Sequence, residues 1–225
     1  MSERGATTAP TLLVVAKAPV AGYAKTRLAR TIGPVAAAEV AAAALLDTLD
    51  VAQSVGWPVV VALAGDLADA FDGDAVDAAL EHTEVVAQVG DGLGERLAAA
   101  HRAADRGHGV VQVGMDTPQV TADDYRAAGT SVAAGRAVIG PADDGGWWLL
   151  GLPDARRASV LTEVPMSTGD TGRLTELALG GSPDRLRELR DIDGWDDALA
   201  VAAGIPGSRT GRVVGRLAVG RGVSA

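Results

Sequence analysis

The segment best equipped for chemistry is residues 138–152, VIGPADDGGWWLLGL, which joins two carboxylates, two adjacent glycines and two tryptophans between apolar runs. Asp143 or Asp144 could deprotonate or orient an acceptor hydroxyl, and Trp147 or Trp148 could offer a flat face to a ring. Because consecutive strand residues face opposite sides of a sheet, one of these tryptophans is expected in the core. The stretch also fits a tight hairpin turn, since Asp-Gly is a common hairpin dipeptide. Spacing alone does not decide between a site and a turn.

Three cations gather around one glycine in a second segment, residues 17–27 (KAPVAGYAKTR), directly after an apolar run. Gly22 would let backbone N–H groups approach an oxyanion, while Lys17 and Lys25 supply point charges. Arg27 could clamp two phosphate oxygens with its planar fork. The segment has neither the Walker A spacing nor the three-glycine dinucleotide fingerprint. We expect a phosphate-binding loop here, with solvated lysines flanking a turn as the alternative.

Two aspartates stand where a metal ion would help such phosphates. Asp116, in GMDTP, comes just after an apolar strand pattern, and Mg²⁺ is commonly held by one or two carboxylates plus substrate oxygens and water. The alternative for Asp116 is an Asx turn to the backbone near Pro118. Asp193, in DIDGWDD, follows another short strand pattern and could be a second ligand. Its alternative is the N-cap of the last helix.

Strand and helix patterns alternate along the chain, which predicts an α/β fold with a largely parallel sheet and helices on both faces. Such a sheet places its binding loops at the carboxyl ends of its strands. Thr121 and Asp124 have capping-box spacing at the start of one helix. The predicted strands are residues 11–16, 58–64, 84–89, 110–113, 137–139, 147–152 and 185–189. The predicted helices are residues 34–55, 94–106, 121–134, 154–161, 173–179 and 191–203, and residues 67–80 mix helix and loop.

Composition restricts the class of protein. The chain has 225 residues, a formal net charge of −9, no cysteine and 3% aromatic residues, which suits one domain with an Ala, Val and Leu core. The acidic balance argues against nucleic acid as a ligand, and the lack of cysteine excludes disulfides and thiolate metal sites. The first ten residues lack the apolar region of a secretory signal, and residues 35–46 are too short to span a bilayer. We therefore expect a cytoplasmic protein whose three histidines, His82, His101 and His108, lie on the surface.

Six segments, taken together and in order, resemble a bacterial family of glycosyltransferase-like proteins related to the molybdopterin and phospholactate guanylyltransferases. They cover roughly residues 12–199 and read KAPVAGYAKTRLA, DGLGERLAAA, GMDTP, GPADDGGWWLLGL, PMST and DIDGWDDAL. The resemblance implies the GT-A fold, a Rossmann-like sheet that binds a nucleoside diphosphate sugar or a nucleoside triphosphate with Mg²⁺ or Mn²⁺. It implies one such domain over residues 1–204. Residues 205–225, rich in Gly and Arg, are then expected to form a flexible or loosely docked tail.

The resemblance also implies a role for individual residues. Those implied for the nucleotide and its phosphates are Lys17, Gly22, Lys25, Arg27, Gly92 and Leu93. Those implied for the metal are Asp116 and Asp193. Those implied for catalysis or the acceptor side are Asp143, Asp144, Gly145, Trp147 and Trp148.

The chain departs from the family pattern mainly on the acceptor side. The family usually has Glu at position 143 and Tyr at positions 147 and 148, and it has Thr-Pro where Gly194 and Trp195 stand here. Met166 replaces the aromatic residue that usually precedes Ser167, and the PMST segment receives no chemical role beyond a possible helix N-cap. The departures leave the acceptor undefined while the nucleotide side keeps its pattern.

Three functions fit these features. The first is a metal-dependent glycosyltransferase that consumes a nucleotide sugar and acts on a small-molecule acceptor. The second is a nucleotidyltransferase that releases pyrophosphate, because the Lys-rich first loop also suits a triphosphate. The third is a noncatalytic nucleotide-binding module. An NAD dehydrogenase fits less well, since the first loop has one glycine where the dinucleotide fingerprint has three.

Overall fold

The computed structural model describes residues 8–222, and its centre is a seven-stranded sheet in the order β3-β2-β1-β4-β6-β5-β7. β6 runs antiparallel to both neighbours, and the other pairings are parallel. The central strands consist mostly of buried Val, Leu and Ala, as expected where both faces of a sheet are covered. The strands are β1 (Thr11–Lys17), β2 (Val59–Ala64), β3 (Glu84–Ala87), β4 (Val110–Gly114), β5 (Val138–Pro141), β6 (Trp147–Leu152) and β7 (Asp184–Arg185).

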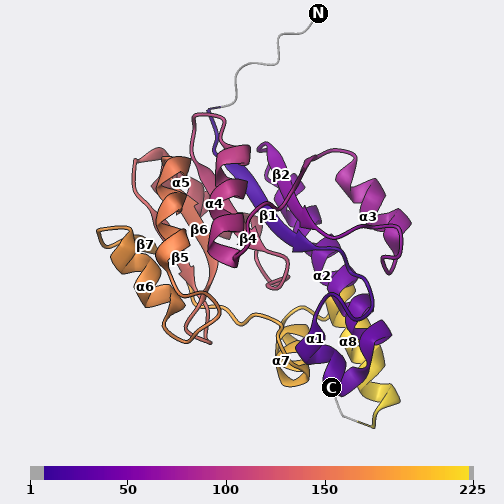
Figure 1. Ribbon diagram of the computed structural model, residues 1–225. Coiled ribbons are helices and arrows are strands. Elements are labelled where there is room, and N and C mark those ends of the chain that lie inside the picture. Colours follow the sequence, from indigo (N-terminus) through magenta and orange to yellow (C-terminus); the bar gives the residue numbers. More distant parts are fainter. Residues whose placement is uncertain (1–7, 223–225) are drawn as a thin grey trace, which may run out of the picture.

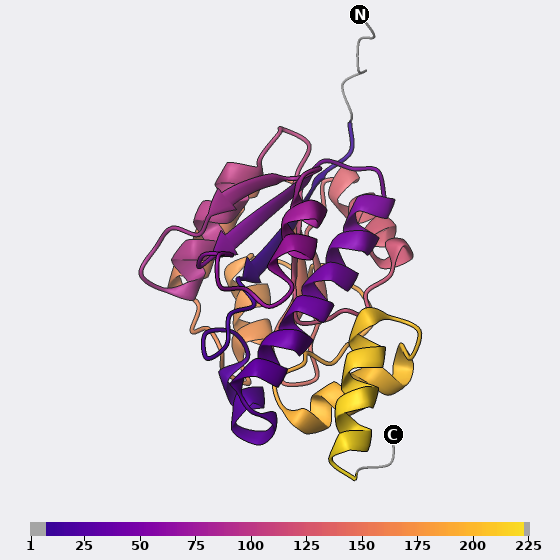
Figure 2. The ribbon, with the colours of Figure 1, turned by 90° about the vertical axis from the view of Figure 1, so that its right-hand side faces the viewer.

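Helices cover both faces of this sheet (Figures 1 and 2). α2, α3 and α5 pack on one face through a cluster that includes Leu45, Val76 and Tyr125. α4 and the 3₁₀-helix η1 pack on the other face. The helices are α1 (Thr26–Ile32), α2 (Pro34–Ser54), α3 (Gly73–Leu80), α4 (Leu93–Ala104), α5 (Ala122–Ala133), η1 (Ala155–Glu163), α6 (Thr171–Ala178), α7 (Trp195–Gly204) and α8 (Arg209–Gly220).

A third group of helices, α1, α7 and α8, lies below the sheet edge at which β1, β4 and β5 end, here called the carboxyl edge (Figure 1). The group has a core of its own that includes Leu28, Ile192 and Val214, each fully buried. It fixes the position of the two segments that flank it in sequence, the loop after β1 and the segment before α7. Both segments carry predicted site residues.

The expected flexible or loosely docked C-terminal tail is wrong for residues 209–220, which form helix α8 packed against the rest of the protein. Its start is held by α2, because both carboxylate oxygens of Asp47 accept backbone N–H groups, from Arg209 and Thr210. Val214 and Ala218 are fully buried on its inner side. The spacing of these apolar residues is helical, and arginines occupy the intervening positions. The Gly- and Arg-rich composition, which resembles that of a linker, therefore belongs to an amphipathic helix.

Apart from α8, most predicted elements are confirmed to within a few residues, with two differences. The Thr121 and Asp124 capping box is present as predicted. α1 was not predicted, and the strand expected at residues 185–189 is reduced to β7 and an isolated bridge from Leu189 to Ala142. The expectation that the first ten residues are not a secretory signal falls mostly on residues 1–7, which lie outside the described residues. None of the helices within residues 8–222 has the length and apolarity of a membrane span.

The prediction that all three histidines lie on the surface is wrong for His101. His82 and His108 are exposed. His101 is fully buried between α4 and the sheet, where its Nε2 lies 3.0 Å from Oε1 of Gln112 on β4. Burial lowers the pKa of His101 to about 4, so the ring is neutral at pH 7.

Candidate active site at the carboxyl edge

Three loops and one crossing segment meet at the carboxyl edge. The loops follow β1, β4 and β5, and the segment of residues 189–193 runs beside the last two. The Ile192 N–H donates to the carbonyl of Asp116 over 2.9 Å, and the Asp143 N–H donates to the carbonyl of Leu189 over 3.0 Å. Strands that end side by side therefore bring four sequence segments together that are far apart along the chain.

The predicted phosphate cation Lys25 and the predicted metal ligand Asp116 form an ion pair. The Lys25 ammonium lies 2.5 Å from Oδ1 of Asp116 and also donates to the carbonyl of Ile192. The Lys25 side chain is only 6% exposed, whereas that of Asp116 is 45% exposed. The Asp116 carboxylate therefore binds Lys25 and does not form the Asx turn considered as its alternative. Its second oxygen remains accessible to solvent.

A second cation and carboxylate also pair, here between α1 and the crossing segment. Arg27, in the first turn of α1, lies 2.5 Å from Asp193, and their side chains are 66% and 49% exposed. The alternative assignment of Asp193 as a helix N-cap is wrong. Gly194 caps α7, and its N–H donates to the Asp197 carboxylate. An exposed pair of this kind contributes about 0–1 kcal/mol to stability, so Asp193 is easily released to another cation.

Asp191 is a member of the site that the sequence reasoning missed. Its Oδ1 is buried and accepts no hydrogen bond within the described residues. Burial, together with the charges of Asp116, Asp144 and Asp193, raises the pKa of Asp191 to about 7, while the charge of Lys25 acts in the opposite direction. Asp191 is therefore partly protonated near neutral pH. The repeated aspartates of the DID motif were its only sequence signal.

The 138–152 segment is both a hairpin turn and part of this edge, so the two interpretations do not exclude each other. Gly145 donates to the carbonyl of Ala142, closing the turn between β5 and β6. Asp144 is exposed, and one of its oxygens accepts the N–H of Gly146. Asp143 is bound to Arg190 at 2.5 Å, so its carboxylate is neutralised by a neighbour.

A bulge in the hairpin separates the two tryptophans. Pro141 pairs with Trp147 and Gly140 with Leu149, which leaves Trp148 as the extra residue. Trp148 is 2% exposed and its indole N–H donates to the carbonyl of Arg187. Trp148 is therefore the core tryptophan, and its assignment to the acceptor side is wrong. Trp147 lies on the opposite face of the sheet, partly exposed, and donates to Thr175.

The residues that directly follow the PMST segment, which had no predicted role, brace the tip of the hairpin. The Gly172 N–H donates to the carbonyl of Gly145 over 2.8 Å. Gly145 has a φ of +86°, and a Cβ there would lie 2.0 Å from the carbonyl oxygen of Gly169. The expected N-cap role is wrong, since Asp170 caps α6. Ser167, exposed in the same segment, has a φ of +60°.

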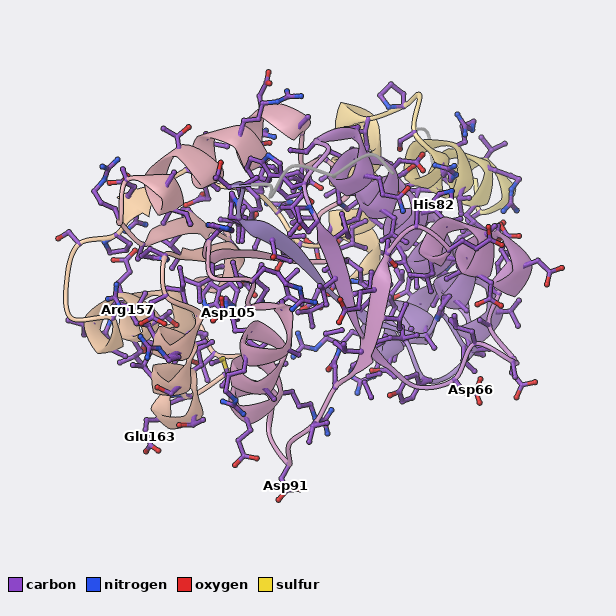
Figure 3. All side chains as sticks on the ribbon, turned by 90° about the horizontal axis from the view of Figure 1, so that it is seen from above. Asp66, His82, Asp91, Asp105, Arg157 and Glu163 are labelled. Atoms are coloured by element: carbon purple, nitrogen blue, oxygen red, sulfur yellow. The ribbon has the colours of Figure 1, made fainter. Side chains whose placement is uncertain are left out.

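The remaining predicted nucleotide residues lie on open loops. Lys17 is exposed, with its ammonium 5.9 Å from the centre of the Tyr23 ring, and Gly22 is exposed with a φ of +81°. Gly92 caps α4 and Leu93 is its first residue, 43% exposed. In Figure 3 the preceding residue, Asp91, projects from the tip of this loop.

The donor set suits a hard divalent cation that binds together with a substrate. Asp116, Asp191 and Asp193 all offer carboxylate oxygens, and the buried oxygen of Asp191 has no hydrogen-bond partner within residues 8–222. Within residues 8–222, no three His, Cys, Asp or Glu side chains are already arranged as a metal cage. Mg²⁺ and Mn²⁺ sites completed by substrate phosphates and water need only one or two protein carboxylates, so the residues fit such an ion.

Comparison with known proteins agrees with this fold. An extensive likeness is to a protein of Desulfovibrio desulfuricans G20 proposed to be a nucleotide-diphospho-sugar transferase. Its TM-score is 0.81 at 25% identity, over 94% of this chain and 95% of that chain. The manganese complex of Rv0371C from Mycobacterium tuberculosis H37Rv is also 25% identical, with a TM-score of 0.52 over 85% of this chain and 97% of that one.

More distant relatives share the fold alone. One is the 4-diphosphocytidyl-2C-methyl-D-erythritol synthase of Anaerococcus prevotii DSM 20548, with a TM-score of 0.55 at 12% identity over 88% of this chain and 99% of that one. Proteins of curated function give no significant sequence match. The predicted GT-A type of fold is confirmed, since the chain has the fold of nucleotide-diphospho-sugar transferases. The family model described as an uncharacterized protein conserved in bacteria (DUF2064) matches residues 46–168, more than half of the chain, which therefore belongs to that family.

Proposed function

We propose that this protein is a divalent-metal-dependent transferase with a nucleotide-activated donor, and that the donor is a nucleoside diphosphate sugar. The observation that carries the proposal is the meeting of a cationic loop and a group of carboxylates at one sheet edge, beside an exposed hairpin. The likeness to the Desulfovibrio protein, which extends over nearly the whole of both chains, supports the same class.

In this proposal the loop after β1 binds the diphosphate of the donor. Lys17, Lys25 and Arg27 would neutralise its oxygens, and backbone N–H groups near Gly22 would approach them. Gly92 and Leu93 would border the nucleobase. Stabilising negative charge as it develops on the diphosphate lowers the barrier for its departure.

Asp116 and Asp193 are the proposed ligands of Mg²⁺ or Mn²⁺, with Asp191 beside them. When bound, such an ion acts as a Lewis acid that stabilises charge on the departing phosphate oxygens. The manganese complex of Rv0371C, a protein 25% identical to this chain, supports the choice of a divalent metal ion.

Asp144 is the proposed acceptor-side base, because its neighbour Asp143 is already paired with Arg190. It would orient an acceptor hydroxyl or take its proton. Trp147 and Gly145 complete this side of the proposed site.

Product analysis tests the proposal. The protein is first screened by thermal shift against nucleoside diphosphates and nucleotide sugars with Mn²⁺, because a bound ligand stabilises the fold. The stabilising nucleotide sugars are then incubated with candidate acceptors. Release of free nucleoside diphosphate by the wild type, and its loss in Asp116→Asn, is the expected result.

Nucleotidyl transfer is the second candidate, favoured by the three cations of the loop after β1, which also suit a triphosphate. It predicts pyrophosphate release from a nucleoside triphosphate and a phosphorylated acceptor. Pyrophosphate without any turnover of nucleotide sugars would replace the first proposal with the second. Metal-dependent binding without either product would leave a noncatalytic nucleotide-binding module.

A further inference from the structure

Lys25 is held more tightly than a residue waiting for a ligand needs to be. Its side chain is 6% exposed and has two partners, the Asp116 carboxylate at 2.5 Å and the carbonyl of Ile192. Its backbone has a φ of +52°, a conformation that costs a residue with a side chain about 1–2 kcal/mol. The ion pair and the buried hydrogen bond hold the residue in that conformation.

This ion pair puts the proposed metal-binding role of Asp116 in conflict with the proposed phosphate-binding role of Lys25. Asp116 is the carboxylate proposed for the metal, and Lys25 is one of the cations proposed for the phosphates. A metal ion bound to an oxygen lies only about 2 Å from it. An ion on the Asp116 carboxylate would therefore sit a few ångströms from the Lys25 ammonium, where like charges repel strongly.

We propose that Lys25 is an exchangeable counter-ion, which occupies the Asp116 carboxylate in the nucleotide-free protein and moves to the donor phosphates when they bind. The inference rests on the proposed function and deepens it. The exchange makes Asp116 available only when phosphate has arrived, so metal and nucleotide bind cooperatively. Couplings between two ligands of this kind are typically about 5- to 150-fold.

The exchange also explains why Lys25 and Arg27 differ in their surroundings. Arg27 pairs with Asp193 at the surface, where solvent screens the pair and either partner is free to leave. Lys25 is enclosed, so its departure needs a replacement anion of equal strength. A phosphate oxygen supplies one, because charge-assisted hydrogen bonds to phosphate match those to carboxylate.

The first test measures Mn²⁺ binding to the nucleotide-free protein by electron paramagnetic resonance of the free ion, which needs no activity. Lys25→Met is expected to bind Mn²⁺ at least about tenfold more tightly than the wild type, because a competing cation has been removed. Arg30→Met is the control. It removes one positive charge from an exposed position in α1, five residues further along and outside the proposed site, and its Mn²⁺ affinity should stay within about twofold of the wild type.

The second test uses inorganic pyrophosphate, the phosphate portion common to the candidate donors and products, with all metal chelated. Lys25→Met should bind it at least about fivefold more weakly than the wild type, and Lys25→Arg should bind it nearly as well. Unchanged pyrophosphate binding in Lys25→Met would overturn the proposal, because Lys25 would then have no second partner.

Weaker or unchanged Mn²⁺ binding in Lys25→Met would also overturn it, and would make Lys25 a fixed brace between two loops. Circular dichroism checks that Lys25→Met is folded. If it is not folded, both tests use Lys25→Gln, whose amide can still donate to a carbonyl. Two other results would contradict the proposed function rather than the role of Lys25. In the first, the wild type binds no Mn²⁺ with any nucleotide; in the second, Asp116→Asn binds Mn²⁺ as tightly as the wild type.

Discussion

Replacing His101 by glutamine should remove an acid-induced loss of stability that the wild type carries. His101 is fully buried, and burial lowers its pKa from 6.5 to about 4. The folded protein therefore keeps the ring neutral while the unfolded chain takes up a proton below about pH 6.5. Because the pKa of this base is lower in the folded protein than in the unfolded chain, protonation at this site costs no stability above pH 6.5. The free energy of unfolding then falls as the pH is lowered from 6.5 toward 4.

The size of the effect follows from the two pKa values. At pH 5 the unfolded chain is stabilised by protonation at this site by about 2 kcal/mol relative to the folded protein, and below pH 4 by about 3 kcal/mol. Glutamine does not titrate, and its amide can still meet Gln112 across the 3.0 Å contact that His101 makes. The carboxylates titrate equally in both proteins, so their contribution cancels in the difference.

Urea unfolding followed by tryptophan fluorescence at pH 7.5 and pH 5.0 measures this difference. The free energy of unfolding of the wild type, minus that of His101→Gln, should be about 2 kcal/mol smaller at the lower pH. A difference that stays constant within about 0.5 kcal/mol would show that the histidine protonates freely in the folded state. The buried position of α4 against β4 would then be wrong.

Three further substitutions and one truncation test the site and its supports. Asp116→Asn should abolish the stabilisation that Mn²⁺ with a bound nucleotide gives the wild type, about 2.7 kcal/mol at one hundred times the dissociation constant, as read by thermal shift. Gly145→Ala should cost about 2 kcal/mol or more in urea unfolding, because its Cβ meets backbone at 2.0 Å, whereas Gly180→Ala, also at positive φ but in open space, should cost about 1 kcal/mol. Trp148→Ala should cost about 3–5 kcal/mol, and a loss below 1 kcal/mol would contradict its core position. Truncation after Gly204 should cost about 3 kcal/mol or more, since it exposes the apolar surface that α8 covers, and an unchanged urea midpoint would return this segment to the status of a tail.

The sequence was sufficient for what local patterns determine. Apolar runs marked the central strands, and the spacing of Thr121 and Asp124 marked the start of α5, because a capping box needs only neighbouring residues. His101 was also within reach. Together with Leu97 and Ala104 it lies on the buried face of α4, at helical spacing.

Pairings between distant segments were beyond such reasoning. Lys25 and Ile192 are 167 positions apart, and Arg27 and Asp193 are 166 apart, so nothing local indicated that predicted phosphate and metal residues neutralise each other. Asp191 was missed for the same reason, since its importance comes from charges that the fold brings near it. The bulge at Trp148 was hidden as well, because strict alternation is the default expectation for a strand.

The two bonds that join the hairpin to the crossing segment have a mechanical consequence. Asp143 is fastened to Leu189 through its backbone and to Arg190 through its side chain, and residues 191–193 follow at once. The hairpin therefore cannot swing aside without pulling on Asp191 and Asp193, which lie one and three residues beyond Arg190. Under the proposed function, acceptor size and metal affinity would be linked, and a change in the length of the hairpin would alter both together.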